Sequence, residues 1–386
     1  MGLLGYSDKK PYYCNTKRIS TNSKRFMNTK RYCIIMAGGI GSRFWPISRH
    51  TRPKQFLDIL GTGKSFIRHT FERFASIIPA ENFLVVTNAI YKDQVLEHIP
   101  EIGPDQILCE PVGRNTAPCI AYAAWRLHTI DPEATMIVTA SDHLILNENE
   151  FCRAIERSAD FAEERGVMMT LGIHPTRPDT GYGYIQIDNS SNAYGSIHKV
   201  KTFTEKPNEE LARTFVESGE FFWNSGIFVW KVSTILAALE RYLPDLAQMF
   251  ASIAPYYATP QEAQYIEQIY PECRNISIDF GVMEKAENVY VCCCECGWSD
   301  IGTWGSLYRY SPKDENGNVS SERCMLYDTE GCIIKTAPDK LTVIEGLKEY
   351  IVVDHDNVLM ICPKANEQNI KRFIDDTKFK IGDEFI

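Results

Sequence analysis

The sequence predicts an α/β protein with a mostly parallel, mixed sheet in its main domain, followed by a small C-terminal β unit. Short apolar runs of strand type alternate with helical periodicity through the first half of the chain, which is typical of a sheet covered by helices on both faces. After Pro312 a polar stretch, residues 313–318, precedes several short strand runs. This change of pattern indicates a separate C-terminal unit.

Apolar periodicity places the elements of the main domain in order. In the first half we expect strands at residues 32–35, 83–86, 106–109 and 136–139, and helices at residues 66–77, 116–128 and 148–165. In the second half we expect strands at residues 182–187, 197–204, 221–232 and 289–291, and helices at residues 209–218 and 234–242. Thr116 has the position and the hydroxyl group of a helix cap.

The C-terminal pattern is richer in strands. We expect these strands at residues 332–334, 341–344, 351–353 and 358–361, with a helix at residues 367–373. The chain is therefore divided into a flexible leader (residues 1–30), a main domain (31–312) and a small, mainly-β domain (313–386).

The first 26 residues are basic and polar, with Asp8 as their single acid, and they lack the apolar segment of a secretory signal. A mitochondrial address would fit this composition. A flexible tail, or an upstream start codon that the cell does not use, fits it better, because Met27 stands where a compact protein of this type would begin.

Composition and charge limit the classes of binding partner and indicate the cellular compartment. The 386 residues carry a net charge of −9, which argues against nucleic acid or an anionic membrane as a general partner. No apolar stretch approaches the roughly 20 residues of a membrane span. Thirteen cysteines, an odd number, without a signal peptide favour free thiols in the cytoplasm. Cys292, Cys293, Cys294 and Cys296 invite a zinc hypothesis, but they follow a strand pattern, so we favour buried strand residues.

A glycine-rich loop directly after the first strand is the most informative motif. It contains Gly38, Gly39 and Gly41, where no Cβ would keep phosphate oxygens from the backbone N–H groups. Arg43 adds a charged fork and Lys54 a mobile point charge, the two side chains best suited to phosphate. The loop is therefore suited to a polyphosphate.

Two common phosphate-binding motifs are excluded. Phe44 stands where a dinucleotide fingerprint needs its third glycine. The segment 63–65, Gly-Lys-Ser, has Asp58 where a P-loop needs its first glycine.

The whole run, GGxGxRxWPxSR followed by PKQF, resembles the sugar-1-phosphate nucleotidyltransferases. The resemblance implies a Rossmann-like nucleotidyltransferase domain whose first loop holds the triphosphate of a nucleotide. By this resemblance the nucleotide is bound by Gly38, Gly39, Gly41 and Ser42, while Arg43 and Lys54 neutralise charge during catalysis. Within the family the pattern is most similar to the members that act on GTP and mannose 1-phosphate.

Asp142 and Asp300 are the candidate metal ligands. Asp142 directly follows a strand pattern, in Thr-Ala-Ser-Asp-His, and Asp300 lies in Gly-Trp-Ser-Asp-Ile-Gly. Taken alone, Asp142 would more often be a turn or helix-cap residue and Asp300 a turn residue. The resemblance identifies both as the family's Mg²⁺ ligands, and Mg²⁺ commonly takes one or two carboxylates together with substrate phosphates. His143, next to Asp142, would be a tempting base but is more often a structural partner.

Further motifs extend the resemblance along residues 31–310. By the resemblance, Glu110, Arg114 and Asn115 in the turn after the third strand would contact the base and ribose; a salt-bridged loop is an equally common alternative for Arg114. On the sugar side the resemblance implies contacts from Gly183, Glu205, Lys206 and Asn224. A carboxylate suits vicinal hydroxyls and an ammonium suits a phosphate monoester; the ordinary alternative for Glu205 and Lys206 is a solvated surface pair.

The implied reaction transfers GMP from GTP to α-D-mannose 1-phosphate and gives GDP-mannose and pyrophosphate. Three alternatives stay open: another sugar 1-phosphate or nucleotide, an additional hexose-phosphate isomerase activity, and a catalytically silent sensing subunit. The second is less favoured because isomerase members carry a further β-barrel with metal-binding histidines, whereas His355 is the single histidine after Pro312. A homodimer is left open.

Overall fold

The computed structural model describes residues 30–190 and 193–386, so the predicted leader lies outside the described residues except for Lys30. The main domain contains a nine-stranded mixed sheet in the order β3-β2-β1-β4-β8-β5-β9-β7-β6. The strands are β1 Arg31–Ala37, β2 Phe83–Asn88, β3 Ile107–Glu110, β4 Thr135–Ala140, β5 Met168–Ile173, β6 Tyr184–Ile187, β7 Ile197–Thr204, β8 Phe221–Lys231 and β9 Val289–Cys294.

Strand direction divides this sheet into two parts. The strands β3, β2, β1 and β4 are parallel to one another, so their carboxyl ends lie at one edge. β8 runs antiparallel to both β4 and β5, and β7 is antiparallel to β9 and β6. The predicted α/β fold is confirmed, and the sequence did not indicate β5, the fully buried strand between β8 and β9.

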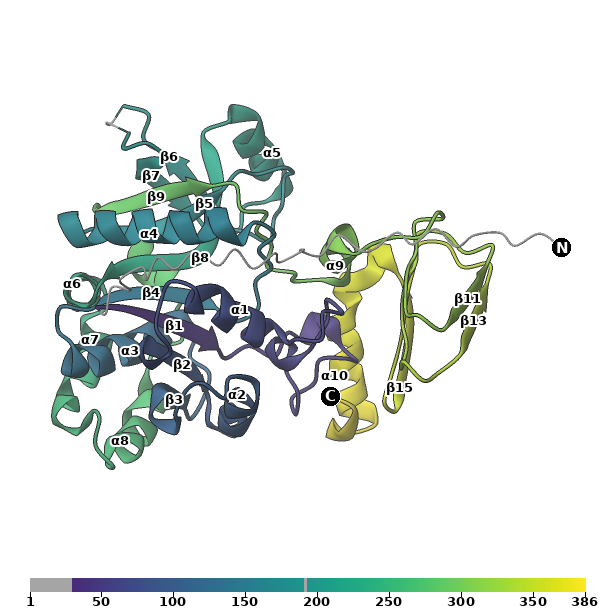
Figure 1. Ribbon diagram of the computed structural model, residues 1–386, viewed down its shortest axis with the longest axis horizontal. Coiled ribbons are helices and arrows are strands. Elements are labelled where there is room, and N and C mark those ends of the chain that lie inside the picture. The colour runs from purple at the N-terminus through teal and green to yellow at the C-terminus, as the bar shows by residue number, and fades with distance from the viewer. Residues whose placement is uncertain (1–29, 191–192) are drawn as a thin grey trace, which may run out of the picture.

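Helices cover both faces of the sheet (Figure 1). One apolar layer is formed with α3, α6 and α7, and the opposite layer with α1, α2 and α4. The helices are α1 Phe66–Ala75, α2 Lys92–His98, α3 Thr116–Ile130, α4 Glu148–Arg165, α5 Glu209–Ser218, α6 Val232–Tyr242, α7 Pro244–Ser252, α8 Glu262–Ile269, α9 Trp304–Tyr310 and α10 Ile370–Lys380.

The expected cap of α3 was wrong. Asn115, not Thr116, is the cap residue, and its Oδ1 accepts from the backbone N–H of Thr116 at 2.9 Å. The hydroxyl of Thr116 instead accepts from the backbone N–H of Ile278 at 2.9 Å. The site-bearing turn is thus tied to a segment more than 150 residues further along the chain.

The C-terminal unit is a small β coil. Its strands are β10 Val319–Ser320, β11 Cys324–Tyr327, β12 Ile333–Lys335, β13 Thr342–Glu345, β14 Tyr350–His355 and β15 Val358–Pro363. β10, β12 and β14 pair in parallel in one sheet, β11 and β13 pair in parallel in another, and the chain therefore alternates between two sheets as it advances. The predicted small β unit is confirmed.

A shared apolar core joins this unit to the glycine-rich loop. Phe44 and Trp304 of the main domain pack in one buried cluster with Ile351 and Ile370 of the C-terminal unit. The Trp45 indole Nε1 donates to the carbonyl of Phe385 at 2.7 Å. Helix α10 accordingly lies between the main domain and the β coil (Figure 1).

The cysteine cluster is part of the core. Cys292, Cys294 and Cys296 are at most 4% exposed and belong to the layer that contains α4. Within residues 30–190 and 193–386 there is no group of three or more His, Cys, Asp or Glu side chains suited to a metal ion. In the same ranges, no helix combines the length and the apolar character needed to span a bilayer.

Candidate active site

The glycine-rich loop leaves β1 at the edge where the parallel strands end. Its fold is fixed by the backbone N–H of Lys54, which donates to the carbonyl of Ile40 at 3.0 Å, and by the Ser48 hydroxyl, which donates to the same carbonyl at 2.5 Å. Gly41 has φ +72°, and a Cβ there would lie 2.4 Å from the Cβ of Lys54. A glycine is therefore required for conformation and for space.

Two distant segments bring Asp142 and Asp300 together at the same edge. The backbone N–H of Ser141 donates to the carbonyl of Met36 at 3.0 Å, which sets Asp142 beside the glycine-rich loop. Leu144 and Ser299 exchange two backbone hydrogen bonds, of 2.8 and 3.0 Å. These bonds hold the segment with Asp300 against the turn after β4.

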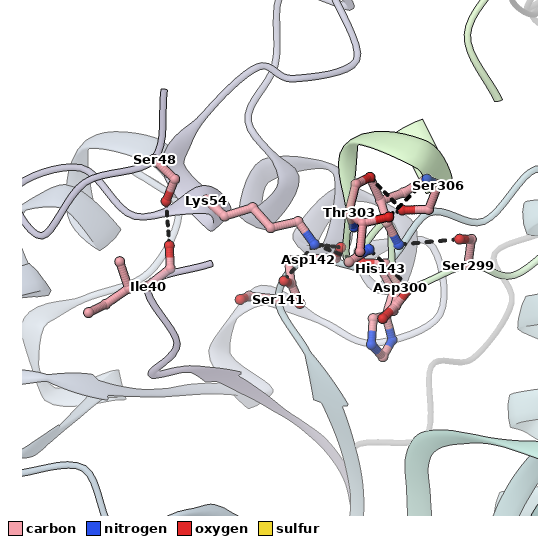
Figure 2. A network of polar contacts seen from close by, with 12 residues as sticks. Ile40, Ser48, Lys54, Ser141, Asp142, His143, Ser299, Asp300, Thr303 and Ser306 are labelled. Atoms are coloured by element: carbon pink, nitrogen blue, oxygen red, sulfur yellow. Dashed lines mark hydrogen bonds and ion pairs between the residues drawn. The ribbon is translucent and has the colours of Figure 1, made fainter. Parts of the chain in front are cut away.

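Lys54 links the two aspartate segments. Its Nζ donates to Oδ2 of Asp142 at 2.8 Å and to the carbonyl of Asp300 at 2.7 Å (Figure 2). The side chain is 3% exposed, and Nζ lies 5.0 Å from the centre of the Phe66 ring. Burial, the largest single effect, favours the neutral acid, but the charges of Lys54 and His143 and the hydrogen bonds to the carboxylate together outweigh it and lower the pKa of Asp142 below its usual value.

Asp300 and His143 also have hydrogen-bond partners. Oδ1 of Asp300 accepts from the Tyr182 hydroxyl at 2.8 Å and from the backbone N–H of Gly302 at 3.0 Å. The Trp298 indole N–H donates to Nδ1 of His143 at 3.2 Å, and burial lowers the pKa of that imidazole. This buried contact agrees with the predicted structural role of His143.

A cavity of about 390 Å³, here called the aspartate cavity, contains this cluster. Its lining residues are Gly41, Ser42, Arg43, Lys54, Asp142, His143, Asp300, Gly302 and Lys371. The Nε of Arg43 is buried and has no hydrogen-bond partner in the part of the chain that the structure describes. A buried donor without a partner is costly, which supports a role for Arg43 in holding an anion.

A second cavity, of about 360 Å³ and here called the glycine-loop cavity, adjoins the first at Gly41 and Asp142. Its lining includes Gly38, Gly39, Glu110, Arg114 and Asn115. The structure thus brings the predicted nucleotide residues to one place, with Ser42 in the adjoining aspartate cavity.

Glu110 has a partner that sequence reasoning missed. The Tyr270 hydroxyl donates to Oε1 of Glu110, whose residue is 6% exposed, and burial raises the pKa of this carboxyl to about 7. Arg114 donates to the carbonyl of Pro271. Tyr270 and Pro271 come from a short turn after α8, and no local motif marks them.

The predicted sugar side is held by close packing. A Cβ at Gly183 would lie 2.7 Å from Oε2 of Glu205, so a larger residue there would displace the Glu205 carboxylate. Nζ of Lys206 lies 2.5 Å from Oε1 of Glu205, and the side chain of Lys206 is 62% exposed. The backbone N–H of Asn224 donates to the carbonyl of Gly183 at 2.8 Å.

Asp279 completes this group and was not predicted. The Asn224 side-chain amide donates to its Oδ1 at 2.8 Å. Burial, with a further contribution from the charge of Glu205, raises the pKa of Asp279 to about 6. Asp279 starts a π-helical turn, residues Asp279–Met283, a feature that is frequent at functional sites but is not visible in a periodicity pattern.

Three loops at the site contain a non-glycine residue with positive φ. These residues are Asn115 (67°), Lys206 (40°) and Ile301 (42°). Such conformations cost free energy and persist where the surroundings enforce them, often at functional sites.

The chain belongs to the nucleotidyl transferase family, whose model matches residues 32–317. A second model, the mannose-phosphate isomerase/GMP-like β-helix domain, matches residues 322–376. The fold and the clustered site therefore define a nucleotidyltransferase enzyme with a C-terminal β-helix-like domain.

Known proteins make the comparison more specific. The chain is 35% identical over 349 residues to a mannose-1-phosphate guanylyltransferase of Klebsiella pneumoniae, covering 89% of this chain and 73% of that protein. A crystal structure of a protein named mannose-1-phosphate geranyltransferase, from Thermus thermophilus, has a TM-score of 0.81 at 29% identity, covering 90% of this chain and 99% of that one. One named mannose-6-phosphate isomerase, from Helicobacter pylori, has a TM-score of 0.57 at 29% identity, covering 70% and 99%.

Proposed function

We propose that this chain transfers GMP from GTP to α-D-mannose 1-phosphate, releasing pyrophosphate and GDP-mannose. The main support is that the glycine-loop cavity and the aspartate cavity meet at Asp142. The predicted nucleotide residues line the first cavity, and Asp300 lines the second. The choice of guanine and mannose is supported by the similarity to the guanylyltransferase of Klebsiella pneumoniae.

The chemistry requires position and charge more than proton transfer. An oxygen of the sugar phosphate attacks the α-phosphorus of GTP, a new P–O bond forms, and the bond to the bridging oxygen of pyrophosphate breaks. Because the attacking oxygen is already anionic, no general base is needed, and the site contributes by orienting two polyanions. Arg43 would hold the leaving pyrophosphate, and Lys206 would orient the attacking phosphate.

Asp142 and Asp300 would hold a Mg²⁺ ion. They are two carboxylates lining one cavity beside Ser42 and glycine backbone, a set of hard oxygen donors that suits Mg²⁺ together with phosphate oxygens. When bound, this ion would neutralise charge on the phosphates. Lys54 positions both aspartate segments through its bonds to Asp142 and Asp300.

The sugar would bind on the open side, near Glu205 and Asn224. Tyr182 connects this side to the aspartates, because its hydroxyl donates to Asp300 while its ring packs edge-on against Trp223, the neighbour of Asn224. Gly183 is buried between these groups, where its carbonyl accepts from the backbone N–H of Asn224 and Oε2 of Glu205 lies beside it. We also propose that the protein acts in the cytoplasm.

Product identification tests the function directly. The protein is incubated with GTP, ATP, UTP or dTTP, each combined with mannose, glucose or fucose 1-phosphate, and sugar nucleotides are separated and identified. We expect GDP-mannose to dominate. Another product would change the substrates but keep the reaction, and the absence of any product would favour a sensing subunit. Parallel incubation with mannose 6-phosphate tests isomerisation, for which we expect no turnover.

A further inference from the structure

One basic residue of the aspartate cavity comes from outside the main domain. Lys371, on the first turn of α10, lines this cavity together with Arg43, Asp142 and Asp300. It is not one of the site residues predicted from the sequence, and it lies beyond residues 32–317, the part that matches the nucleotidyl transferase model. A residue of the C-terminal unit therefore faces the proposed phosphates.

The position of Lys371 is fixed by its neighbours. Ile370, the preceding residue, is fully buried in the core that contains Phe44 of the glycine-rich loop and Trp304 of α9. Glu367, one turn earlier, accepts from the backbone N–H of Gly305 at 2.7 Å. Because both contacts are made to the main domain, the start of α10 is held at the cavity.

Lys371 differs from the other basic residues that follow it on α10. Arg372, Lys378 and Lys380 each lie within 4 Å of an acid, Asp376 or Asp383. Lys371 is exposed, and among residues 30–190 and 193–386 its ammonium group has neither an ion pair nor a hydrogen bond. Its charge is thus available to a ligand in the cavity.

The arrangement of the two cavities indicates which part of the ligand is near Lys371. Residues assigned to the base and ribose line the glycine-loop cavity, and the junction is at Gly41 and Asp142. A nucleotide that enters the first cavity with its base would therefore extend its β- and γ-phosphates into the aspartate cavity. The proposed sugar residues Gly183, Glu205 and Asn224 are not among the residues described as lining it.

We infer that Lys371 binds the pyrophosphate portion of the nucleotide, so that the C-terminal unit completes the leaving-group subsite. This inference rests on the proposed function for the identity of the substrates. A lysine is a suitable point charge for phosphate. Because Lys371 is exposed to solvent, its contribution should decrease as salt increases.

The test compares Lys371→Ala with Arg372→Ala, a neighbouring exposed residue that loses the same charge outside the cavity. In the reverse reaction, GDP-mannose plus pyrophosphate, we expect Lys371→Ala to raise the KM for pyrophosphate about 3- to 10-fold and to leave the KM for GDP-mannose unchanged. Lys371→Arg should keep most of the wild-type affinity. Arg372→Ala should behave as wild type. An unchanged KM for pyrophosphate, or an equal rise in both alanine variants, would overturn the inference.

A binding measurement separates this inference from the proposed reaction. Calorimetric titration with inorganic pyrophosphate and Mg²⁺ needs neither guanine nor mannose. If the wild type fails to turn over GDP-mannose, the proposed function is wrong, but weaker pyrophosphate binding in Lys371→Ala alone would still support the subsite. Equal binding by the wild type and Lys371→Ala, at equal melting temperatures, would reject it.

Discussion

The two sides of the site differ in how far they are already assembled. On the nucleotide side Lys54 is 3% exposed and Glu110 6% exposed, and both have hydrogen-bond partners from remote segments. On the sugar side Lys206 is 62% exposed and Glu205 31% exposed, and the charged partner of each is the other. The side chains of Lys54 and Glu110 are part of the core, whereas those of Lys206 and Glu205 are in contact with solvent.

This difference suggests different costs of binding. A preformed, buried site loses little conformational freedom when the ligand arrives, whereas exposed lysine and glutamate side chains must be ordered. We therefore expect substitutions on the nucleotide side to change both stability and catalysis. Substitutions on the sugar side should change the affinity for one substrate and leave stability nearly constant.

The largest effect is expected for Lys54→Met. It leaves Asp142 without its cation and the carbonyl of Asp300 without its donor, and breaking a buried pair in this way costs about 3 kcal/mol of unfolding free energy or more. Lys206→Met, the matched change on the sugar side, should cost less than about 0.5 kcal/mol. Urea unfolding of both variants is the measurement. Equal losses would remove the distinction between the two sides.

Asp142→Asn and Asp300→Asn should each lower turnover at limiting Mg²⁺ about 10²-fold, or about 3 kcal/mol, because each removes a carboxylate charge from the proposed ion site. Asp105→Asn, at an exposed position, controls for loss of an acid. Turnover close to wild type in either folded variant would show that this aspartate does not hold the ion.

The sequence allowed the α/β fold and the loops of the site to be predicted because these depend on local signals. Strand runs followed by Gly41 or Asp142 are visible within a few residues, and α4 begins and ends where periodicity placed it. Tyr270 and Asp279 were missed because only tertiary packing brings them to Glu110 and Asn224.

The C-terminal unit shows the same limit. The strands β12 to β15 were expected from apolar runs, whereas β10 and β11 were missed. The parallel pairing of β10, β12 and β14 in a coil depends on contacts between successive turns. The place of Lys371 at the cavity likewise depends on the burial of Ile370 against the main domain. The individual contacts of Glu205, Lys206 and the other predicted site residues with substrate stay predictions.

A moderate, selective effect is expected on the sugar side. Glu205→Gln and Lys206→Ala should raise the KM for mannose 1-phosphate about 10-fold, because each removes one charged contact, and should change the KM for GTP less than about 2-fold. Lys201→Ala, an exposed lysine on the neighbouring strand β7, is the control. Initial rates with each substrate varied separately provide the answer. A rise in the KM for GTP alone would move this motif to the nucleotide side.

The smallest effect concerns the pH dependence of GTP binding. Burial raises the pKa of Glu110 to about 7, since the hydrogen bonds from Tyr270 and Cys119 compensate only part of the cost of its charge. Its second oxygen, Oε2, faces the glycine-rich loop, where a Cβ at Gly38 would lie 3.3 Å away. This oxygen accepts a hydrogen bond better when the carboxyl is ionised.

The direction of the pH effect on GTP binding follows from the pKa of Glu110. The neutral form of Glu110 dominates below about pH 7 and the ionised form above it, so its contact with a donor group of the base should strengthen as pH rises. We expect the KM for GTP to fall about 3-fold between about pH 6 and pH 8 in the wild type, relative to Glu110→Gln. The variant does not titrate at this position, and the comparison therefore removes the ionisation of GTP itself. A parallel pH profile in both proteins would show that Glu110 serves only to hold Tyr270 in the core.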